Sequence, residues 1–313
     1  MSRRVTLILN TGAGHDDKAA ARGLIEERLA AAAVAVDVIE IAKEGDVCAQ
    51  IRAAVEQAHA AGQLIVAAGG DGTVNTVAAL CVALKAPMGI IPMGTFNYFA
   101  RDLGIPTEIG AAADLLATTP PRPVAVGLLQ DRVFINNASF GKYAKIVRNR
   151  EEDKARFGRY RIVALLSEIK SLYARSRIFS VRVGADSLEK RLRTTMIFAG
   201  INKVQMENLG MARAEDASRL KMAVAVLKPV GFLGMTRILL RGLFRRLPED
   251  ERVEVFYTET FTVEGAADSI SCVVDGEIVN LRMPLEFRLL QDGLQVVAPV
   301  PANPAAEVPQ GGA

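Results

Sequence analysis

Strand-like and helical patterns alternate through the first hundred residues of this 313-residue chain. The apolar strand-like runs are residues 5–9, 36–41, 64–68 and 88–92, and the helical patterns between them are residues 16–33, 46–61 and 72–84. Apolar strands that follow one another through helical crossovers form a parallel sheet with both faces covered. The sequence therefore predicts an N-terminal α/β domain with a doubly wound parallel sheet, whose ligands bind beyond the carboxyl ends of the strands.

The pattern changes after the proline cluster of Pro120, Pro121 and Pro123. The later strand-like runs are residues 124–129, 132–136, 179–183, 194–199, 221–227, 254–258, 261–264, 271–274 and 285–290, with one long helical pattern over 151–175. Strands without helical crossovers predict an antiparallel β-sandwich. We expect an α/β domain over 1–122, which the chain end near 291–300 could complete. A β-sandwich domain over 123–290 and a disordered tail over 301–313, rich in proline, alanine and glycine, follow.

Composition excludes several classes of protein. Half of the residues are apolar and the formal charge is +3, which is globular and too weakly basic for a dedicated nucleic-acid binder. The three cysteines, Cys48, Cys81 and Cys272, are far apart, so we expect buried thiols rather than disulfides or a metal site. Two histidines are too few for a histidine-based zinc site. The start of the chain lacks the apolar run of a signal peptide, and no segment has the length of a membrane span, so a cytoplasmic protein is expected.

A glycine-rich turn joins the run at 64–68 to the next helix and reads Gly69-Gly70-Asp71-Gly72-Thr73-Val74-Asn75. Glycines let the main chain approach a ligand closely, and the start of a helix offers N–H groups and a positive dipole end to phosphate. Such a turn alone is equally well a tight connection. Two more strands end in small polar loops, Asn10-Thr11-Gly12-Ala13-Gly14 and Gly94-Thr95-Phe96-Asn97. Three loops at one sheet edge predict a phosphate site that is neither a P-loop nor a dinucleotide fingerprint.

With these loops the chain resembles the diacylglycerol kinase catalytic domain family, which includes bacterial lipid kinases and is related to sphingosine kinases. The resemblance spans nearly the whole chain, and its other carriers are residues 99–106, Asn136-Asn137-Ala138-Ser139-Phe140-Gly141 and Asp275-Gly276-Glu277. In that family the glycine-rich and N-terminal loops hold the ATP phosphates and the Gly-Thr loop completes the site. The resemblance thus implies that residues 1–122 are the ATP-binding domain and residues 123–290 the lipid or acceptor domain. The implied ATP contacts are Asn10, Thr11, Gly12, Ala13, Gly14, Gly69, Gly70, Asp71, Gly72, Thr73, Asn75, Gly94, Thr95 and Asn97.

The resemblance also implies the catalytic groups and the metal. By itself the Asp275-Gly276-Glu277 segment would be a hairpin turn with solvated acids, whereas the family makes Glu277 the base for the attacking hydroxyl. Asp275 either assists by orientation or metal contact, or caps the turn. Phosphoryl transfer needs Mg²⁺, and Asp71 on the phosphate loop is placed to hold it directly or through water. The residues implied for a separate structural Mg²⁺ are Asp216 through its side chain and Arg213 and Ser218 through main-chain oxygens, with an empty, degenerate site as the open alternative.

The expected function is an ATP-dependent lipid kinase that phosphorylates a hydroxyl of diacylglycerol or a related lipid. Two departures from the family leave the acceptor open: the altered first loop, and Tyr98 where many relatives have an aspartate. The alternatives are an NAD kinase or phosphofructokinase-like enzyme, and a non-catalytic nucleotide-sensing protein at the membrane. Basic and apolar residues mix over 154–177 and 230–247, which suits peripheral contact with a membrane or helices packed on the sandwich. The expected partner is a lipid substrate at the inner membrane face and not a nucleic acid, and a homodimer remains open.

Overall fold

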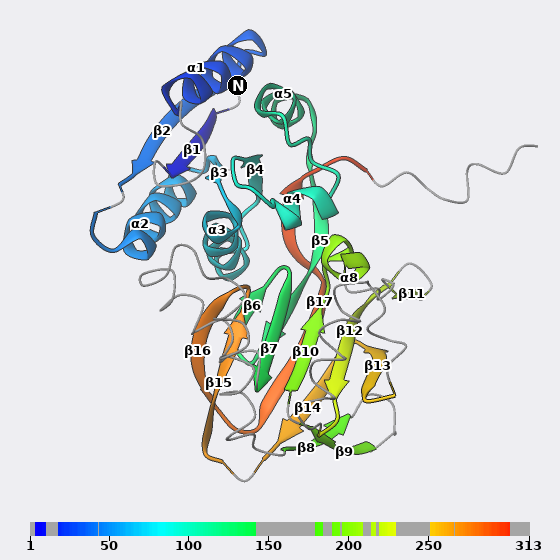
Figure 1. Cartoon of the computed structure of the whole chain (residues 1–313). Helices are drawn as coiled ribbons and strands as arrows, with labels where there is room; N and C mark the ends of the chain where they lie inside the picture. The colour runs from blue at the N-terminus through cyan, green and yellow to red at the C-terminus, as the bar shows by residue number, and fades with distance from the viewer. Residues whose placement is uncertain are drawn as a thin grey trace, which may run out of the picture. The chain divides into compact units, whose positions relative to one another are not determined.

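The computed structural model describes residues 4–10, 18–42, 44–141, 179–183, 190–194, 196–208, 214–216, 219–229, 251–265 and 267–300 (Figure 1). The chain divides into two compact units, one of Met1–Pro123 with Gln295–Ala313 and one of Val124–Leu294. The predicted long helix at 151–175, the basic and apolar segment at 230–247 and the predicted disordered tail at 301–313 lie outside the described residues.

The first unit is built on a parallel sheet. Its elements are β1 (Arg4–Asn10), α1 (Lys18–Ala31), β2 (Ala35–Ile41), α2 (Val47–Ala60), β3 (Leu64–Gly69), α3 (Asp71–Leu84), β4 (Met88–Pro92), α4 (Tyr98–Asp102) and α5 (Ile109–Thr118). The strands run in the order β2-β1-β3-β4, all parallel, and the end of β17 (Leu285–Val297) pairs in parallel with β4 through Val296 and Met88. This arrangement confirms the predicted doubly wound α/β fold.

Helices cover both faces of this sheet, with α1 and α5 packed together on one side and α2 and α3 on the other (Figure 1). All six residues of β3 are buried, as expected for a strand covered on both faces. Helix α2 buries a stripe at Ile51, Ala54, Val55 and Ala58, the spacing of one helix face. Its start is capped by Asp46, whose carboxylate accepts the Ala49 N–H at 3.0 Å. Local sequence therefore accounts well for the elements of this unit, although α5 was not predicted.

The second unit is antiparallel. Its elements are β5 (Pro121–Leu129), β6 (Arg132–Phe134), β7 (Asn137–Gly141), β8 (Phe179–Val183), β9 (Lys190–Thr194), β10 (Met196–Gly200), α8 (Lys203–Asn208), β11 (Ala214–Asp216), β12 (Arg219–Leu227), β13 (Val253–Thr258), β14 (Thr260–Glu264), β15 (Ser269–Val274) and β16 (Glu277–Arg282), with most of β17. One set of strands runs β17-β14-β8-β9, with β5 pairing β17 and β6. The other runs β11-β12-β10-β7-β15-β16, with β13 on β12.

The main core of the second unit lies between these two sets of strands. Phe261 of β14 and Phe287 of β17 are fully buried there, with their rings stacked 4.1 Å apart. Alternate residues of β12 and β7 face the same core, among them Val224 and Phe140. A smaller cluster on the other face of β10 and β12 includes Phe198 and packs against α8. Two packed antiparallel layers confirm the predicted sandwich.

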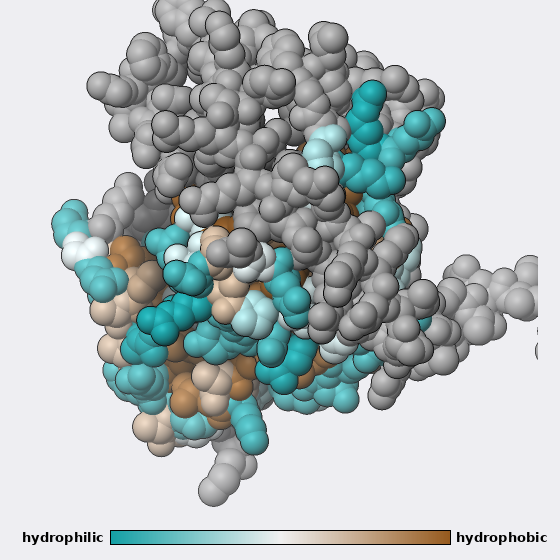
Figure 2. All heavy atoms as spheres, turned by 90° about the horizontal axis from the view of Figure 1, so that it is seen from below, coloured by the Kyte–Doolittle hydropathy of each residue, from teal (hydrophilic) through white to brown (hydrophobic). Residues whose placement is uncertain are grey.

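The described surface is mixed in character. On the face seen in Figure 2, hydrophobic residues are interspersed with hydrophilic ones. None of the described helices is long and apolar enough to cross a membrane.

Cys81 and Cys272 are buried, and burial raises the pKa of each thiol to about 12. The prediction of a buried thiol was wrong for Cys48, which is exposed near the start of α2 because it lies off the buried stripe of that helix.

Candidate functional site

The turn from β3 into α3 presents an open helix start. Helix α3 begins at Asp71, with Gly70 as its extended N-cap and no side chain capping it. The first main-chain bond of the helix runs from the Val74 N–H to the Gly70 carbonyl at 3.1 Å, and the Asp71 N–H donates to the Asp71 carboxylate. The Gly72 and Thr73 N–H groups have no main-chain acceptor within the helix. Gly72 is exposed, and a Cβ at this position would have no heavy atom within 4 Å. The helix start therefore offers N–H donors, a favourable dipole and free space to an anion such as phosphate.

The end of β1 is tied to the same helix start. The Asn10 side-chain amide donates to the Thr73 hydroxyl at 2.7 Å. Thr73 is buried, and a Cβ on Gly69 would lie 2.8 Å from the Thr73 Oγ1, so the strand end and the first turn of α3 are closely packed. Three residues predicted to contact ATP therefore lie together, although Asn10 comes from a distant part of the sequence. The other predicted residues of the first loop, Thr11, Gly12, Ala13 and Gly14, lie outside the described residues.

The Asp71 carboxylate joins the glycine-rich turn to the loop after β4. Its Oδ2 accepts the Asn97 N–H at 3.0 Å, and its Oδ1 accepts the Tyr98 N–H at 2.8 Å. These two N–H groups are at the start of α4, so Asp71 caps that helix from another segment. We call this contact the Asp71 clamp. It brings together Asp71 and Asn97, both predicted to contact ATP.

The loop held by the clamp is also closed on itself. Asn97 has a left-handed backbone, with φ of 49°, and its side-chain oxygen accepts the Gly94 N–H while its nitrogen donates to the Gly94 carbonyl, both at 2.9 Å. A Cβ on Gly94 would lie 2.7 Å from the Gly70 Cα, so the two turns meet backbone to backbone. Thr95 is exposed in this loop and Asn75 is half-buried on α3. The result is a preformed pair of loops at the carboxyl ends of β3 and β4.

The charge state of Asp71 bears on metal binding. Burial raises the pKa of its carboxyl, and the hydrogen bonds from the Tyr98 and Asn97 main chain act in the opposite direction. The carboxylate also accepts the Asp71 main-chain N–H, so its two oxygens accept three bonds in all and are not saturated. Among the residues that the structure describes, no three or more acidic, histidine or cysteine side chains gather as a metal site. A cation beside Asp71 would therefore take most ligands from phosphate and water, which is the usual habit of Mg²⁺.

The second predicted site is the turn between β15 and β16. Val274 pairs with Glu277, and the two residues between them have positive φ, 47° at Asp275 and 94° at Gly276. Two left-handed residues are the requirement of a tight type I′ hairpin. The turn therefore has the hairpin geometry that its sequence predicts.

The two carboxylates of this turn have different surroundings. The Asp275 carboxylate accepts three main-chain N–H groups, from Ile135 at 2.7 Å, Asn136 at 2.9 Å and Asn137 at 2.8 Å. Glu277 is exposed, and its carboxylate makes no hydrogen bond or ion pair within the described part of the chain. Asp275 thus holds the main chain of residues 135–137, and Glu277 is the carboxylate left open to a ligand.

Two neighbouring residues that sequence analysis did not single out belong to this region. Asn202 is fully buried and its amide donates to the Asn136 side chain at 2.9 Å, while Gln205 accepts from the Asn137 side chain at 2.8 Å. Asparagine and glutamine before or within a short helix carry no local signal of such contacts. Of the predicted structural Mg²⁺ site, Asp216 ends β11, whereas Arg213 and Ser218 lie outside the described residues.

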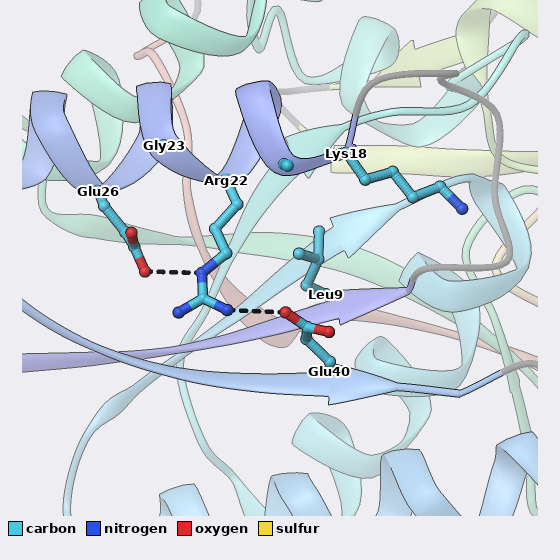
Figure 3. Close-up of a pocket in the computed structure, with 7 residues that line it drawn as sticks. Leu9, Lys18, Arg22, Gly23, Glu26 and Glu40 are labelled. Atoms are coloured by element: carbon cyan, nitrogen blue, oxygen red, sulfur yellow. Dashed lines mark hydrogen bonds and ion pairs between the residues drawn. The ribbon is translucent and has the colours of Figure 1, made fainter.

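A pocket of about 480 Å³ lies beside α1, β1 and β2 (Figure 3). Its lining is Leu9, Lys18, Ala19, Arg22, Gly23, Glu26 and Glu40, and none of these was predicted to bind ATP. Arg22 forms ion pairs with Glu26 at 2.9 Å and Glu40 at 2.7 Å, and the bond to Glu26 is the main cause that raises the pKa of Arg22. The arginine charge is therefore already balanced by two carboxylates, which leaves the pocket without the clear anion preference of the α3 start.

Comparison with known proteins shows what the first part of the chain is similar to. Residues 4–129 match the model of the diacylglycerol kinase catalytic domain family. The match includes the glycine-rich turn, the Asp71 clamp and the loop after β4, so the open start of α3 lies within the matched segment.

Individual proteins are also similar to this chain. The diacylglycerol kinase of Bacillus subtilis strain 168 is 43% identical over 97 residues, which cover 30% of this chain and 32% of that protein. An uncharacterised protein of Synechocystis is 29% identical over 310 residues, 94% of this chain and 70% of its own length. A crystal structure of a diacylglycerol kinase from Bacillus anthracis strain Sterne shares the fold, with a TM-score of 0.68 and 24% identity over 97% of this chain and 98% of that one. The chain thus aligns with only about a third of the Bacillus subtilis kinase.

Proposed function

We propose that the protein is an ATP-dependent lipid kinase, which transfers the γ-phosphate of ATP to a hydroxyl of diacylglycerol or a related lipid. The observation that carries the proposal is the open, uncapped start of α3, braced by the Asp71 clamp inside a diacylglycerol kinase catalytic domain. The names of the relatives, diacylglycerol kinase and lipid kinase YegS-like, support a lipid as the acceptor.

The nucleotide would be held mainly by main-chain groups. The N–H groups at the start of α3 donate to phosphate oxygens, and Gly70 and Gly72 leave room for the phosphate to come close. The Asp71 clamp and the Asn97 side chain hold the facing loop in place before ATP arrives. Preformed loops lower the ordering cost of binding, which favours affinity.

Asp71 is also the residue proposed to hold Mg²⁺, directly or through water, with the lone pairs that the clamp leaves. When bound there, the ion would supply positive charge that offsets the charge developing on the phosphate during transfer. The partial burial that raises the pKa of Asp71 also favours a cation beside it, because a nearby positive charge stabilises the carboxylate.

Glu277 is proposed as the general base. Its exposed carboxylate accepts the proton of the lipid hydroxyl while the hydroxyl oxygen forms a bond to the γ-phosphorus. The bond between that phosphorus and the β–γ bridging oxygen breaks, ADP leaves, and the product is a phosphorylated lipid. We propose that this reaction takes place on lipids at the inner membrane surface.

The test is transfer of radiolabelled phosphate from ATP with Mg²⁺ to lipids in mixed micelles. The panel contains diacylglycerol, phosphatidylglycerol and a sphingoid base, with NAD and fructose 6-phosphate as soluble acceptors. Wild type is compared with Glu277→Gln and with Glu286→Gln, a matched change of an exposed glutamate on β17. We expect one lipid to be labelled, about 100- to 10,000-fold more slowly by Glu277→Gln and normally by Glu286→Gln.

Other outcomes would reject parts of the proposal. Labelling of NAD or the sugar phosphate without any lipid would point to a soluble phosphotransferase. ATP binding without transfer to any acceptor would favour a nucleotide-sensing protein. Full activity of Glu277→Gln on a lipid would keep the kinase and remove Glu277 as its base.

A further inference from the structure

Asn136 and Asn137 join the Asp275 turn to helix α8. Their main-chain N–H groups donate to the Asp275 carboxylate at 2.9 and 2.8 Å. Their side chains form hydrogen bonds with residues at the start of α8: the Asn136 oxygen accepts from the Asn202 amide at 2.9 Å, and the Asn137 amide donates to Gln205 at 2.8 Å. Two adjacent residues therefore connect the turn that carries the proposed base to the start of a helix.

The start of α8 is itself well defined by this contact. Asn202 caps the helix, because its side-chain oxygen accepts the Gln205 N–H at 3.0 Å and its carbonyl accepts the Met206 N–H at 3.0 Å. The same side chain also donates to Asn136, and both residues are almost completely buried, at 0% and 3% exposure. Buried amides of this kind are costly unless bonded, so each constrains the other.

Sheet pairing alone does not hold the turn. The ladder between β15 and β7 ends at the pair of Val274 and Ala138. Beyond it, the Asp275 N–H donates to the Asn137 carbonyl at 2.8 Å, and the three bonds accepted by the Asp275 carboxylate complete the attachment. Glu277 begins β16 two residues later, so the direction of its side chain follows from the position of this turn.

We propose that Asp275, Asn136, Asn137 and Gln205 are positioning residues for Glu277. The Asp275 carboxylate accepts the main-chain N–H groups of the two asparagines, and the asparagine side chains form hydrogen bonds with the start of α8. The inference rests on the proposed function, in which Glu277 accepts the proton of the acceptor hydroxyl. Displacement of a catalytic group by about 1 Å can cost about 100-fold in rate, so such attachment has a direct kinetic consequence.

Four variants test this assignment. Asp275→Asn retains one acceptor oxygen and turns an amide N–H₂ toward the main-chain donors. Gln205→Ala removes the acceptor of the Asn137 amide, whereas Gln205→Glu keeps an oxygen there. Asn280→Ala is the matched control, because it removes a surface hydrogen bond with Ser271 on the same hairpin, at 2.7 Å, without touching the turn.

Activity on the labelled lipid is measured below the melting temperature of every variant. We expect kcat to fall about 100-fold in Asp275→Asn and about 10-fold in Gln205→Ala, with the KM for ATP unchanged. Gln205→Glu and Asn280→Ala should retain wild-type kcat. A merely structural role for Gln205 would instead lower the melting temperature of Gln205→Ala and leave its kcat, measured below that temperature, at the wild-type value.

Amide hydrogen exchange gives a second reading that needs no activity. The main-chain N–H of residue 275 should exchange faster in Asp275→Asn and in Gln205→Ala than in wild type, and at the wild-type rate in Gln205→Glu and Asn280→Ala. If wild type phosphorylates no lipid, the proposed function fails and exchange alone decides the coupling.

Several results would overturn the inference. Unchanged exchange at Asp275 in Gln205→Ala would show that α8 does not hold the turn. Wild-type kcat in Asp275→Asn would show that the turn does not position the base. A raised KM for the lipid with intact kcat in Gln205→Ala would mean that Gln205 contacts the substrate directly.

Discussion

The Gly72→Ala variant distinguishes a role of Gly72 in the proposed phosphate site at the start of α3 from a role in protein stability. Gly72 lies in the first turn of the helix and is exposed, and a Cβ added to it would have no heavy atom within 4 Å. Alanine is favoured over glycine in helices by up to about 1 kcal/mol, and we expect about half of that in a first turn. The variant should therefore be slightly more stable than wild type, with a melting temperature about 1–2 °C higher.

ATP binding by the same variant should be weaker. The Cα–Cβ bond of a helical residue tilts toward the helix N-terminus, so the new methyl group enters the space assigned to phosphate. Loss of one hydrogen bond to a charged group costs about 1.5–3 kcal/mol, which weakens ATP binding about 10- to 150-fold. Stability and affinity are thus expected to change in opposite directions.

Gly23→Ala is the matched control. Gly23 is an exposed residue of α1 that also has nothing within 4 Å of the added carbon, and it lines the pocket of Figure 3. Because Gly23 lies in the interior of α1, the variant should raise the melting temperature about twice as much as Gly72→Ala and leave ATP affinity unchanged. Calorimetric titration gives the dissociation constants, and thermal unfolding gives the stabilities.

Two outcomes would refute the reasoning. Wild-type ATP affinity in Gly72→Ala, together with the expected stabilisation, would show that phosphate does not sit at the start of α3. Weaker ATP binding by Gly23→Ala would instead place the nucleotide in the pocket beside α1.

Three further changes test other parts of the structure. Gly94→Ala would put a carbon 2.7 Å from the Gly70 Cα, so we expect about 1–3 kcal/mol of destabilisation and weaker ATP binding, and wild-type values in unfolding and titration would contradict the close approach. Phe287→Ala removes a fully buried ring stacked on Phe261 and should cost about 3–5 kcal/mol in urea unfolding, whereas a loss below about 1 kcal/mol would argue against that core. The pKa of Glu108 is lowered, chiefly because its carboxylate accepts the Ala111 N–H. The ionised carboxylate therefore stabilises the fold above the ordinary glutamate pKa, and this stabilisation is lost as the pH falls through the pKa that Glu108 has in the folded protein. The melting temperatures of wild type and Glu108→Gln should accordingly differ at neutral pH and converge in acid, and a constant difference across pH would contradict the capping role.

The periodicity of apolar residues predicted the strands and helices of the first unit well, because the residues within and next to each element are enough to specify it. Strand β3 is a continuous apolar run and α2 has an apolar stripe with a capping aspartate ahead of it, and both are found close to their predicted bounds. The glycine-rich turn was likewise placed correctly, at the junction of β3 and α3. Chain-local propensities and capping are enough for such elements.

Local pattern was weaker in the second unit. Strand β7, Asn137–Gly141, is small and polar in sequence and was not predicted, since its residues gain their strand conformation from neighbours on both sides. Strand β16, Glu277–Arg282, was missed for a related reason, because its alternation is blurred by exposed polar residues. Tertiary pairing, rather than local propensity, makes these segments strands.

The sequence by itself determined the alternation of strands and helices, the polar loops at the strand ends and the residue types that phosphate transfer requires. Only the tertiary structure decided how those residues are used. Asp71 reaches the main chain of Asn97 and Tyr98, and Asp275 reaches three N–H groups of a segment that lies far earlier in the chain. A carboxylate that accepts main-chain hydrogen bonds from a distant segment leaves no periodic mark in the sequence, because any residue except proline can supply the N–H.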